Sequence, residues 1–192
     1  MDTTGSFFPA TTTVTGLNVR GMEEVVGAQF GLMPPRRDIM VIGIGNPLRG
    51  DDAVGLYLLE RLSKHFSGDF RGIIAYEADI GLAEEISSYP ELLIIDAMAE
   101  PLQEPFKLFP LAPAATIFPA GGFSSHIFNW RMVLAMSRDI FGRSPKAVLC
   151  GISAYDFEID ECLSPSCQHD ADAAFAYLTD LLRKPGEGVD KN

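Results

Sequence analysis

Five segments of the chain carry the apolar pattern expected of β-strands. Glycine, proline or charged residues separate these segments, and the one at 92–97 is an almost unbroken apolar run. A run of that kind is typical of a strand that is covered on both faces of a sheet. The segment at 106–109 is weaker, and we expect it to be an edge strand. The predicted strands are Ile39–Gly45, Ile73–Ala78, Leu92–Ala97, Phe106–Phe109 and Ala147–Ser153.

Apolar residues between these strands recur at the spacing of amphipathic helices. Val54, Tyr57, Leu58 and Leu62 follow one another at i, i+3, i+4 and i+8, which places them on one helical face. The predicted helices lie at 54–62, 82–88, 127–141 and 171–182. This alternation predicts an α/β fold, in which a mostly parallel, twisted sheet of about five strands carries helices on both faces as a three-layer sandwich.

The pattern divides the chain into three parts. Residues 1–37 are rich in threonine, glycine and phenylalanine and end in a proline pair and two arginines, so we predict an N-terminal arm there. Whether this arm is flexible, packs on the domain or docks a partner stays open. Residues 38–184 are predicted to form a single α/β domain, and residues 185–192 a loose polar tail.

Composition narrows the classes of function. The 192 residues contain 47% hydrophobic and 21% charged residues, which is typical of one globular domain. The net charge of −11 repels phosphate backbones, so we do not expect nucleic acid as a partner. No apolar stretch approaches the roughly 20 residues of a membrane span, so membrane insertion is not expected. The odd count of three cysteines favours reduced thiols and a cytoplasmic location.

Acidic residues and one histidine follow the predicted strands or open a predicted helix. Asp51 and Asp52 come after the first strand, Asp96 closes the third strand, and His126 precedes the third helix. In a parallel sheet, ligand sites form beyond the carboxyl ends of the strands. Carboxylates with one imidazole are ligands suited to a divalent first-row metal. The joint pattern therefore favours a metal site, although Asp51 alone is explained equally well as a helix N-cap.

The glycine-rich segment after the first strand is not a nucleotide-binding motif. A dinucleotide fingerprint would need a third glycine where Leu48 stands. Two aspartates follow where a pyrophosphate would need a bare helix N-terminus, and no lysine is placed as in a phosphate-binding loop. We assign no role to His65, near the end of a predicted helix, or to His169, which precedes the last predicted helix.

Three segments, in this order, resemble the motifs of the hydrogenase maturation endopeptidases. Gly43–Gly55 is similar to the opening motif of that family, in which a G-x-G-N turn precedes an acidic pair and a glycine. Leu92–Ala97 resembles the second motif, an apolar strand that ends in Asp-Ala. Ser124–His126 resembles the third, a histidine that opens a helix. The resemblance covers roughly residues 38–184.

The resemblance implies an endopeptidase that removes the C-terminal extension from the large-subunit precursor of a nickel–iron hydrogenase after metal insertion. It implies that Asp52, Asp96 and His126 are the catalytic residues and the ligands of a divalent cation, thought to be nickel delivered with the substrate. Such a metal would polarise a peptide carbonyl or activate water. Alternatively, the nickel only docks the precursor, and Asp52 or Asp96 acts as general base.

Substrate contacts are expected close to these residues. Family members often carry an Asp-Gly-Gly-Thr-like segment after the second strand, where this chain has Glu77–Gly81. We expect an acidic side chain of this segment to replace the contact made there. The predicted substrate-binding residues are Gly45, Asn46, Asp51, Glu77 and Asp79.

Two other interpretations of the same residues stay open. One is a non-catalytic module that senses nickel and serves as a docking or chaperone protein in hydrogenase assembly. The other is a phosphoryl-accepting, receiver-like domain, since an acidic pair follows the first strand and Asp96 ends the third. The glycine-rich turn and His126 have no role in a receiver-like domain, so we favour the endopeptidase.

Overall fold

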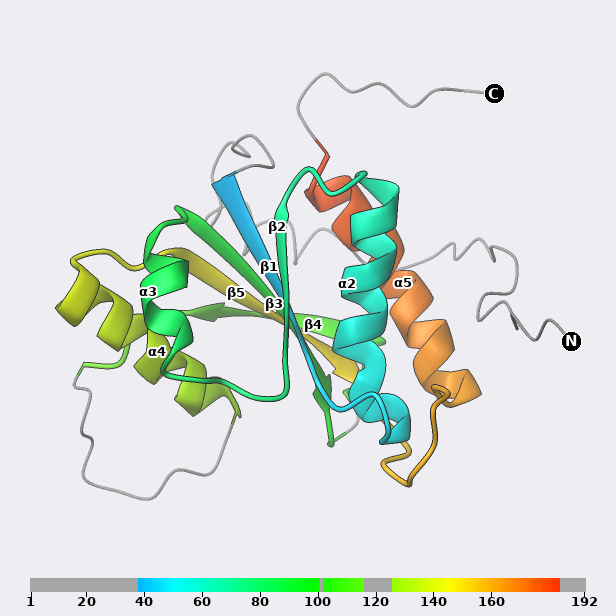
Figure 1. Cartoon of the computed structure of the whole chain (residues 1–192). Coiled ribbons are helices and arrows are strands. Elements are labelled where there is room, and N and C mark those ends of the chain that lie inside the picture. The colour runs from blue at the N-terminus through cyan, green and yellow to red at the C-terminus, as the bar shows by residue number, and fades with distance from the viewer. Residues whose placement is uncertain (1–37, 101, 116–125, 184–192) are drawn as a thin grey trace, which may run out of the picture.

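The computed structural model describes residues 38–100, 102–115 and 126–183, with side chains from Trp130 onward in the last range (Figure 1). The predictions for the arm at 1–37 and the tail at 185–192 lie outside these residues. None of the described helices is long and apolar enough to cross a membrane.

A five-stranded sheet in the order β2-β1-β3-β5-β4 forms the centre of the domain. Neighbouring strands are parallel except β4, which pairs antiparallel with β5 at one edge. The predicted α/β class, strand number and edge position of β4 are therefore confirmed. The elements are β1 (Ile39–Ile44), the 3-10 helix η2 (Gly50–Ala53), α2 (Val54–His65), β2 (Arg71–Ala75), α3 (Leu82–Ser87), β3 (Glu91–Met98), β4 (Phe106–Leu111), α4 (His126–Phe141), β5 (Lys146–Ser153) and α5 (Pro165–Leu181).

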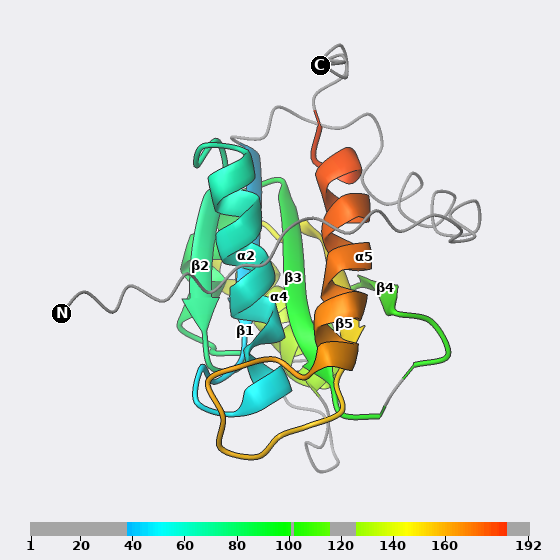
Figure 2. The same ribbon diagram turned by 90° about the vertical axis from the view of Figure 1, so that its right-hand side faces the viewer.

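Helices cover both faces of the sheet and create two separate hydrophobic cores (Figures 1 and 2). On one face, Leu58 of α2 and Leu178 of α5 are buried with Ile95 of β3. On the other face, Ile86 of α3 and Trp130 of α4 are buried with strand residues of the opposite parity. Both parities of β1 and β3 are apolar because each strand must fill both cores.

Several predicted boundaries differ from those of the structure. β2 ends at Ala75 rather than at 78, because its partner β1 ends at Ile44, which pairs with Ala75. α5 begins at Pro165 rather than near 171, because Ser164 caps it by accepting the Cys167 N–H and proline suits the first helical position. His169 therefore lies inside α5 instead of before it. β3 ends at Met98 rather than at 97, so Asp96 lies within the strand, two residues before its end.

The strand order creates a topological switch point between β1 and β3. The chain leaves β1 through α2 to reach β2 on one side, and then returns through α3 to β3 on the other side of β1. The chain after β1 leads to α2 on one face, whereas the chain after β3 leads through β4 to α4 on the other face, so the two connections separate at the carboxyl ends of these strands. Ligand sites in open parallel sheets form in this crevice, and the candidate residues lie near the end of β3 or after β1.

Candidate active site

Gly45 allows the chain to fold back sharply after β1. Its φ of +138° lies in the region that favours glycine, and a Cβ atom there would lie 1.7 Å from the carbonyl oxygen of Asp52. No side chain larger than hydrogen fits that distance. The predicted role of Gly45 in substrate binding stays a prediction, since the structure gives it this backbone role.

Gly55 brings the first turn of α2 against the ends of both central strands. A Cβ atom on Gly55 would lie 2.3 Å from the carbonyl oxygen of Ile44 and 2.4 Å from that of Ile95. Gly43 packs against the same turn, since a Cβ atom added to Gly43 would lie 2.5 Å from the carbonyl oxygen of Gly55. This packing holds η2, which carries Asp52, beside the end of β3, which carries Asp96.

Asp52 is half-buried and oriented by the turn that precedes it. Its Oδ2 atom accepts the backbone N–H of Asn46 at 2.9 Å. The Asn46 side chain in turn accepts the N–H of Leu48 at 3.0 Å, which closes the turn. Asn46 therefore positions Asp52 through its backbone, and its predicted contact with substrate stays a prediction. Within the described part of the chain, the second carboxylate oxygen of Asp52 has no hydrogen-bond partner.

Asp96 is almost completely buried in the sheet, with 1% of its surface exposed. It pairs in register with Gly151 of β5, and its Oδ1 accepts the N–H of Ala97 at 2.9 Å. Strand alternation places Asp96 on the same face as Leu92 and Ile94, which belong to the core under α3 and α4. Asp96 is therefore directed toward the layer that contains α4.

The backbone of His126 opens α4, as predicted, and Figure 1 shows that α4 begins at the end of the sheet where β1 and β3 finish. The His126 side chain lies outside the described residues. Among the residues that are described, no group of three or more histidine, cysteine and acidic side chains is arranged to hold a metal ion. Metal binding by Asp52, Asp96 and His126 thus stays a prediction.

Asp51 has an environment different from that of its neighbour Asp52. It is fully buried, with 0% exposure. Its carboxylate accepts the backbone N–H groups of Tyr155 and Asp156 at 2.8 and 3.0 Å, and both the N–H and the hydroxyl of Ser164 at 2.6 and 2.8 Å. These four bonds join η2 to the loop between β5 and α5. A substrate contact at Asp51, which stays a prediction, would have to displace them.

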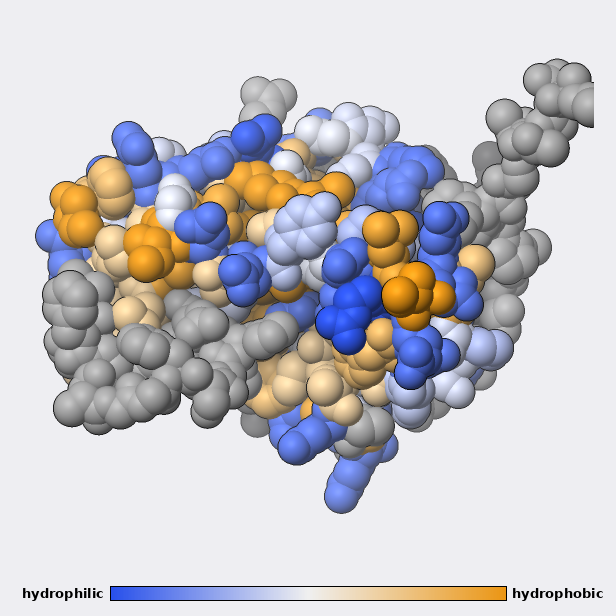
Figure 3. Space-filling view, turned by 60° about the horizontal axis from the view of Figure 1, so that its bottom comes forward, coloured by the Kyte–Doolittle hydropathy of each residue, from blue (hydrophilic) through white to orange (hydrophobic). Residues whose placement is uncertain are grey.

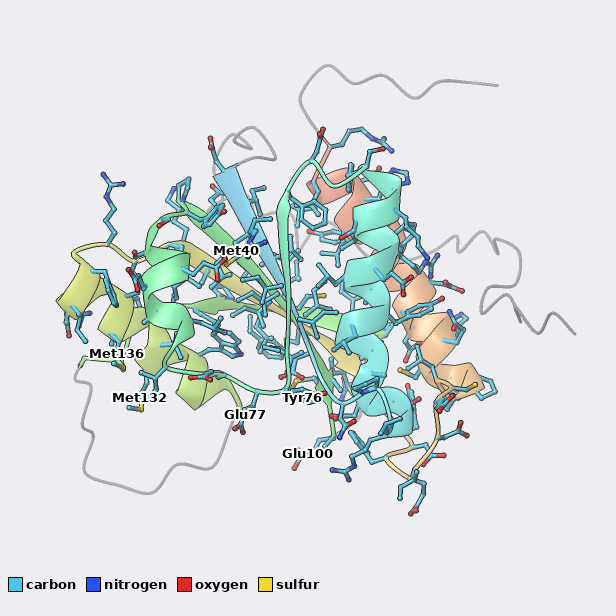
Figure 4. The ribbon with its side chains drawn as sticks, viewed as in Figure 1. Met40, Tyr76, Glu77, Glu100, Met132 and Met136 are labelled. Carbon is cyan, nitrogen blue, oxygen red and sulfur yellow. The ribbon has the colours of Figure 1, made fainter. Side chains whose placement is uncertain are left out.

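Glu77 and Asp79 follow β2 at the same end of the sheet, and both are exposed. Asp79 accepts the N–H of Gly81 at 2.7 Å, which forms a local turn before α3. Figure 4 shows Glu77 with Tyr76 and Glu100 at this end, far from Met40 in the sheet. Seen from this end, the surface carries several hydrophobic patches between hydrophilic residues (Figure 3). The predicted contacts of Glu77 and Asp79 with substrate stay predictions.

The loop between β5 and α5 adds negative charge beside η2, which the sequence analysis did not consider. The Gly50 and Asp51 N–H groups donate to the carbonyl oxygens of Asp160 and Asp156, both at 2.8 Å. Four exposed acidic residues lie in this loop: Asp156, Glu158, Asp160 and Glu161. Their charges favour a basic partner over an acidic one.

A second polar cluster at this loop was also missed. The Tyr155 hydroxyl donates to Asp170 at 2.7 Å, and Nδ1 of His169 lies 3.1 Å from the other Asp170 oxygen. The hydrogen bond to this carboxylate raises the pKa of Tyr155 above its usual value. The signal for this cluster was the Ser-Pro pair at 164–165, which starts α5 early enough to include His169.

None of the buried cysteines is suited to act as a nucleophile. Cys150 and Cys167 are buried, and burial raises the pKa of both thiols. The negative charge of Asp51 raises the pKa of Cys167 further. Since the thiolate is the reactive form, these residues are inert.

The fold is the one found in solved hydrogenase maturation endopeptidases, which confirms the resemblance at the level of architecture. The chain matches the hydrogenase maturating endopeptidase HybD from E. coli with a TM-score of 0.60 and 23% identity, over 76% of this chain and 91% of that chain. The NiFe hydrogenase maturation protease HycI from Thermococcus kodakarensis matches with a TM-score of 0.60 and 22% identity, over 82% of this chain and 98% of that chain. The hydrogenase 2 maturation peptidase from a Thaumarchaeota archaeon matches with a TM-score of 0.53 and 22% identity, over 75% of this chain and 97% of that chain. No family model and no curated protein matches the chain.

Proposed function

We propose that this protein is an endopeptidase that removes the C-terminal extension of a nickel–iron hydrogenase large-subunit precursor. The observation that carries the proposal is the pair of carboxylates at the switch point, namely Asp52 in η2, which follows β1, and Asp96 near the end of β3. Two of the solved proteins with this fold, from E. coli and Thermococcus kodakarensis, are hydrogenase maturation proteases by name.

The two carboxylates differ in exposure, which supports different roles. Asp52 is half-buried and keeps one oxygen without a protein partner among the described residues, so it is the better placed to take a proton from an attacking water. Asp96 is buried and fixed by β3, so it supplies a negative charge in a set position. A water molecule would lose a proton to Asp52 and attack the peptide carbonyl, and the leaving amine would then take up that proton from Asp52 as the C–N bond breaks.

Nickel enters this proposal as part of the substrate. Two carboxylate oxygens and the imidazole of His126, which opens α4, are a donor set that accepts a divalent first-row ion. These residues would recognise the nickel of a loaded precursor and so hold its C-terminal segment beside Asp52. Processing would then follow metal insertion, because a metal-free precursor lacks the group that is recognised.

We also propose a cytoplasmic location. The cysteines Cys150, Cys162 and Cys167 are all free, and Cys162 is exposed. An exposed free thiol is suited to a reducing compartment.

Intact-mass measurement on a precursor tests the proposal. A nickel-loaded large-subunit precursor and the same precursor without metal are each incubated with and without this protein. The proposal predicts loss of one defined C-terminal peptide from the nickel-loaded form only. Stable binding to the precursor without any mass change would instead support the non-catalytic docking module.

A further inference from the structure

The β2 edge of the sheet leaves backbone groups unpaired in the described part of the chain. β2 is the terminal strand in the sheet order, and it pairs only with β1. The Ala75 carbonyl accepts the Gly45 N–H at 3.1 Å, so Ala75 directs its backbone groups toward β1. Alternate residues of a strand direct these groups to opposite sides. Gly72 and Ile74 therefore direct their N–H and C=O groups outward. The N–H of Tyr76 also points outward, because it shares a planar trans peptide group with the Ala75 carbonyl. Figure 2 shows β2 at the margin of the sheet.

The side chains of this edge are apolar and exposed. Ile74 is 61% exposed, and Tyr76, directly after β2, is 71% exposed. Sheet edges are usually protected by lysine, proline or a bulge. The one charged residue of β2 is Arg71, and its guanidinium is bonded to Glu85 of α3 at 2.8 Å.

We propose that the β2 edge binds an extended segment of the precursor as an additional strand. Addition of a strand to a free edge provides main-chain hydrogen bonds, while side chains on alternate positions provide selectivity. In this mode the outward groups of Ile74 and Tyr76 bond to the precursor backbone. Apolar side chains of the precursor segment would cover Ile74 and Tyr76. This inference rests on the proposed function, since it assigns the surface that binds the substrate of that site.

The occupant is a precursor segment because the edge is continuous with the candidate site. Ala75 bonds to Gly45, and Gly45 begins the turn that carries Asp52. A strand added beyond β2 would lie about 10 Å from β1 and about 15 Å from β3, at roughly 4.8 Å per strand. About three to five extended residues span that distance, at roughly 3.4 Å per residue. The bound strand would therefore end a few residues from the scissile bond.

The negative charge near the end of β2 restricts which precursor sequences can bind there. The exposed carboxylates of Glu77 and Asp79 stand where β2 ends, in a protein of net charge −11. A segment that passes from the edge to the site must cross them. The segment should therefore be apolar where it pairs with β2 and basic where it passes Glu77.

Two substitutions at one position separate the backbone from the side chain. Ile74→Ala removes the apolar side chain and keeps the N–H group, whereas Ile74→Pro also removes the N–H group. That N–H points away from β1, so proline leaves the β1–β2 ladder intact. With nickel-loaded precursor, we expect Ile74→Pro to raise KM about tenfold relative to Ile74→Ala with little change in kcat. Equal KM values for folded Ile74→Pro and Ile74→Ala would overturn the proposal.

Amide hydrogen exchange in the wild-type protein provides a test that needs no variant and no cleavage. Addition of nickel-loaded precursor to the full-length protein should slow amide exchange at Ile74 and Tyr76. The exchange rates of Ile73 and Ala75 should not change. No added protection at Ile74 in a precursor-bound sample would contradict the proposal. Protection that depends on self-association, seen as a dimer by light scattering, would assign the edge to a second copy and also overturn it. Loss of the proposed function is a separate result, namely binding and edge protection without any change in precursor mass.

Discussion

Asp51 and Ser164 are 113 positions apart in the chain and are joined by two hydrogen bonds. The Ser164 N–H donates to Oδ1 of Asp51 at 2.6 Å, and the Ser164 hydroxyl donates to Oδ2 at 2.8 Å. The same hydroxyl accepts the Cys167 N–H at 3.2 Å and so caps α5. One serine thus connects the loop that presents Asp52 to the start of the last helix.

Asp51→Asn should destabilise the fold much more than Asp52→Asn. An amide at position 51 places an NH₂ group against the donors of Tyr155, Asp156 or Ser164, which leaves buried groups without partners. The expected loss in unfolding free energy is about 3 kcal/mol or more for Asp51→Asn, against less than about 1 kcal/mol for the half-buried Asp52. Urea denaturation measures both. Equal stabilities would show that the four bonds to Asp51 contribute little.

Gly45→Ala should disrupt the site through a steric clash. The added methyl group would lie 1.7 Å from the Asp52 carbonyl oxygen, so η2 would have to move. Gly68→Ala is the matched control, because Gly68 also has a positive φ, of 74°, but has nothing within 4 Å of an added Cβ. We expect a loss of about 1 kcal/mol for Gly68→Ala and at least about 3 kcal/mol for Gly45→Ala in thermal or urea unfolding. Similar losses for the two variants would contradict a role for close packing at Gly45.

Glu91 should make stability depend on pH. It is buried at the start of β3, and its Oε2 has no hydrogen-bond partner among the described residues. Burial raises its pKa from 4.5 to about 7, against the opposing effect of Lys146. The folded state therefore holds a proton that the unfolded state releases, so stability is greatest below pH 4.5 and falls as pH rises to about 7.

Glu91→Gln removes this titration. The stability of the variant relative to wild type should increase by up to about 3 kcal/mol between pH 4.5 and about 8, from 1.36 kcal/mol per pKa unit. Urea unfolding across this pH range measures the difference. A constant difference between Glu91→Gln and wild type would show that Glu91 titrates alike in both states.

The fold was largely predictable because its determinants are local. Each central strand has an apolar run, and the helices between them repeat their apolar residues at helical spacing. Asp96 was found because an acidic residue at the end of a buried run, as at 92–97, stands out in the sequence. The start of α5 was missed because apolar periodicity begins only near 171, while its cap is the Ser-Pro pair at 164–165.

The different environments of Asp51 and Asp52 could not be predicted from the pattern of the sequence, and only the family resemblance assigned these residues different roles. They are neighbours of the same type, and both follow the first strand. Their difference depends on donors at 155, 156 and 164, more than 100 positions later. No local pattern shows that a β5–α5 loop will fold against η2. The substrate-binding edge of β2 depends likewise on sheet order, which only the three-dimensional structure provides.

Multiple-turnover processing tests the central claim most directly. A molar excess of nickel-loaded large-subunit precursor is incubated with wild-type protein, Asp52→Asn or Asp96→Asn, and the precursor mass is followed over time. The account predicts that wild type shortens every precursor molecule by the same C-terminal peptide. Both variants should stay folded and lose activity by at least about 100-fold, since each removes a carboxylate of the site. Undiminished turnover by both variants, or no turnover by the wild type with its cognate precursor, would contradict the account.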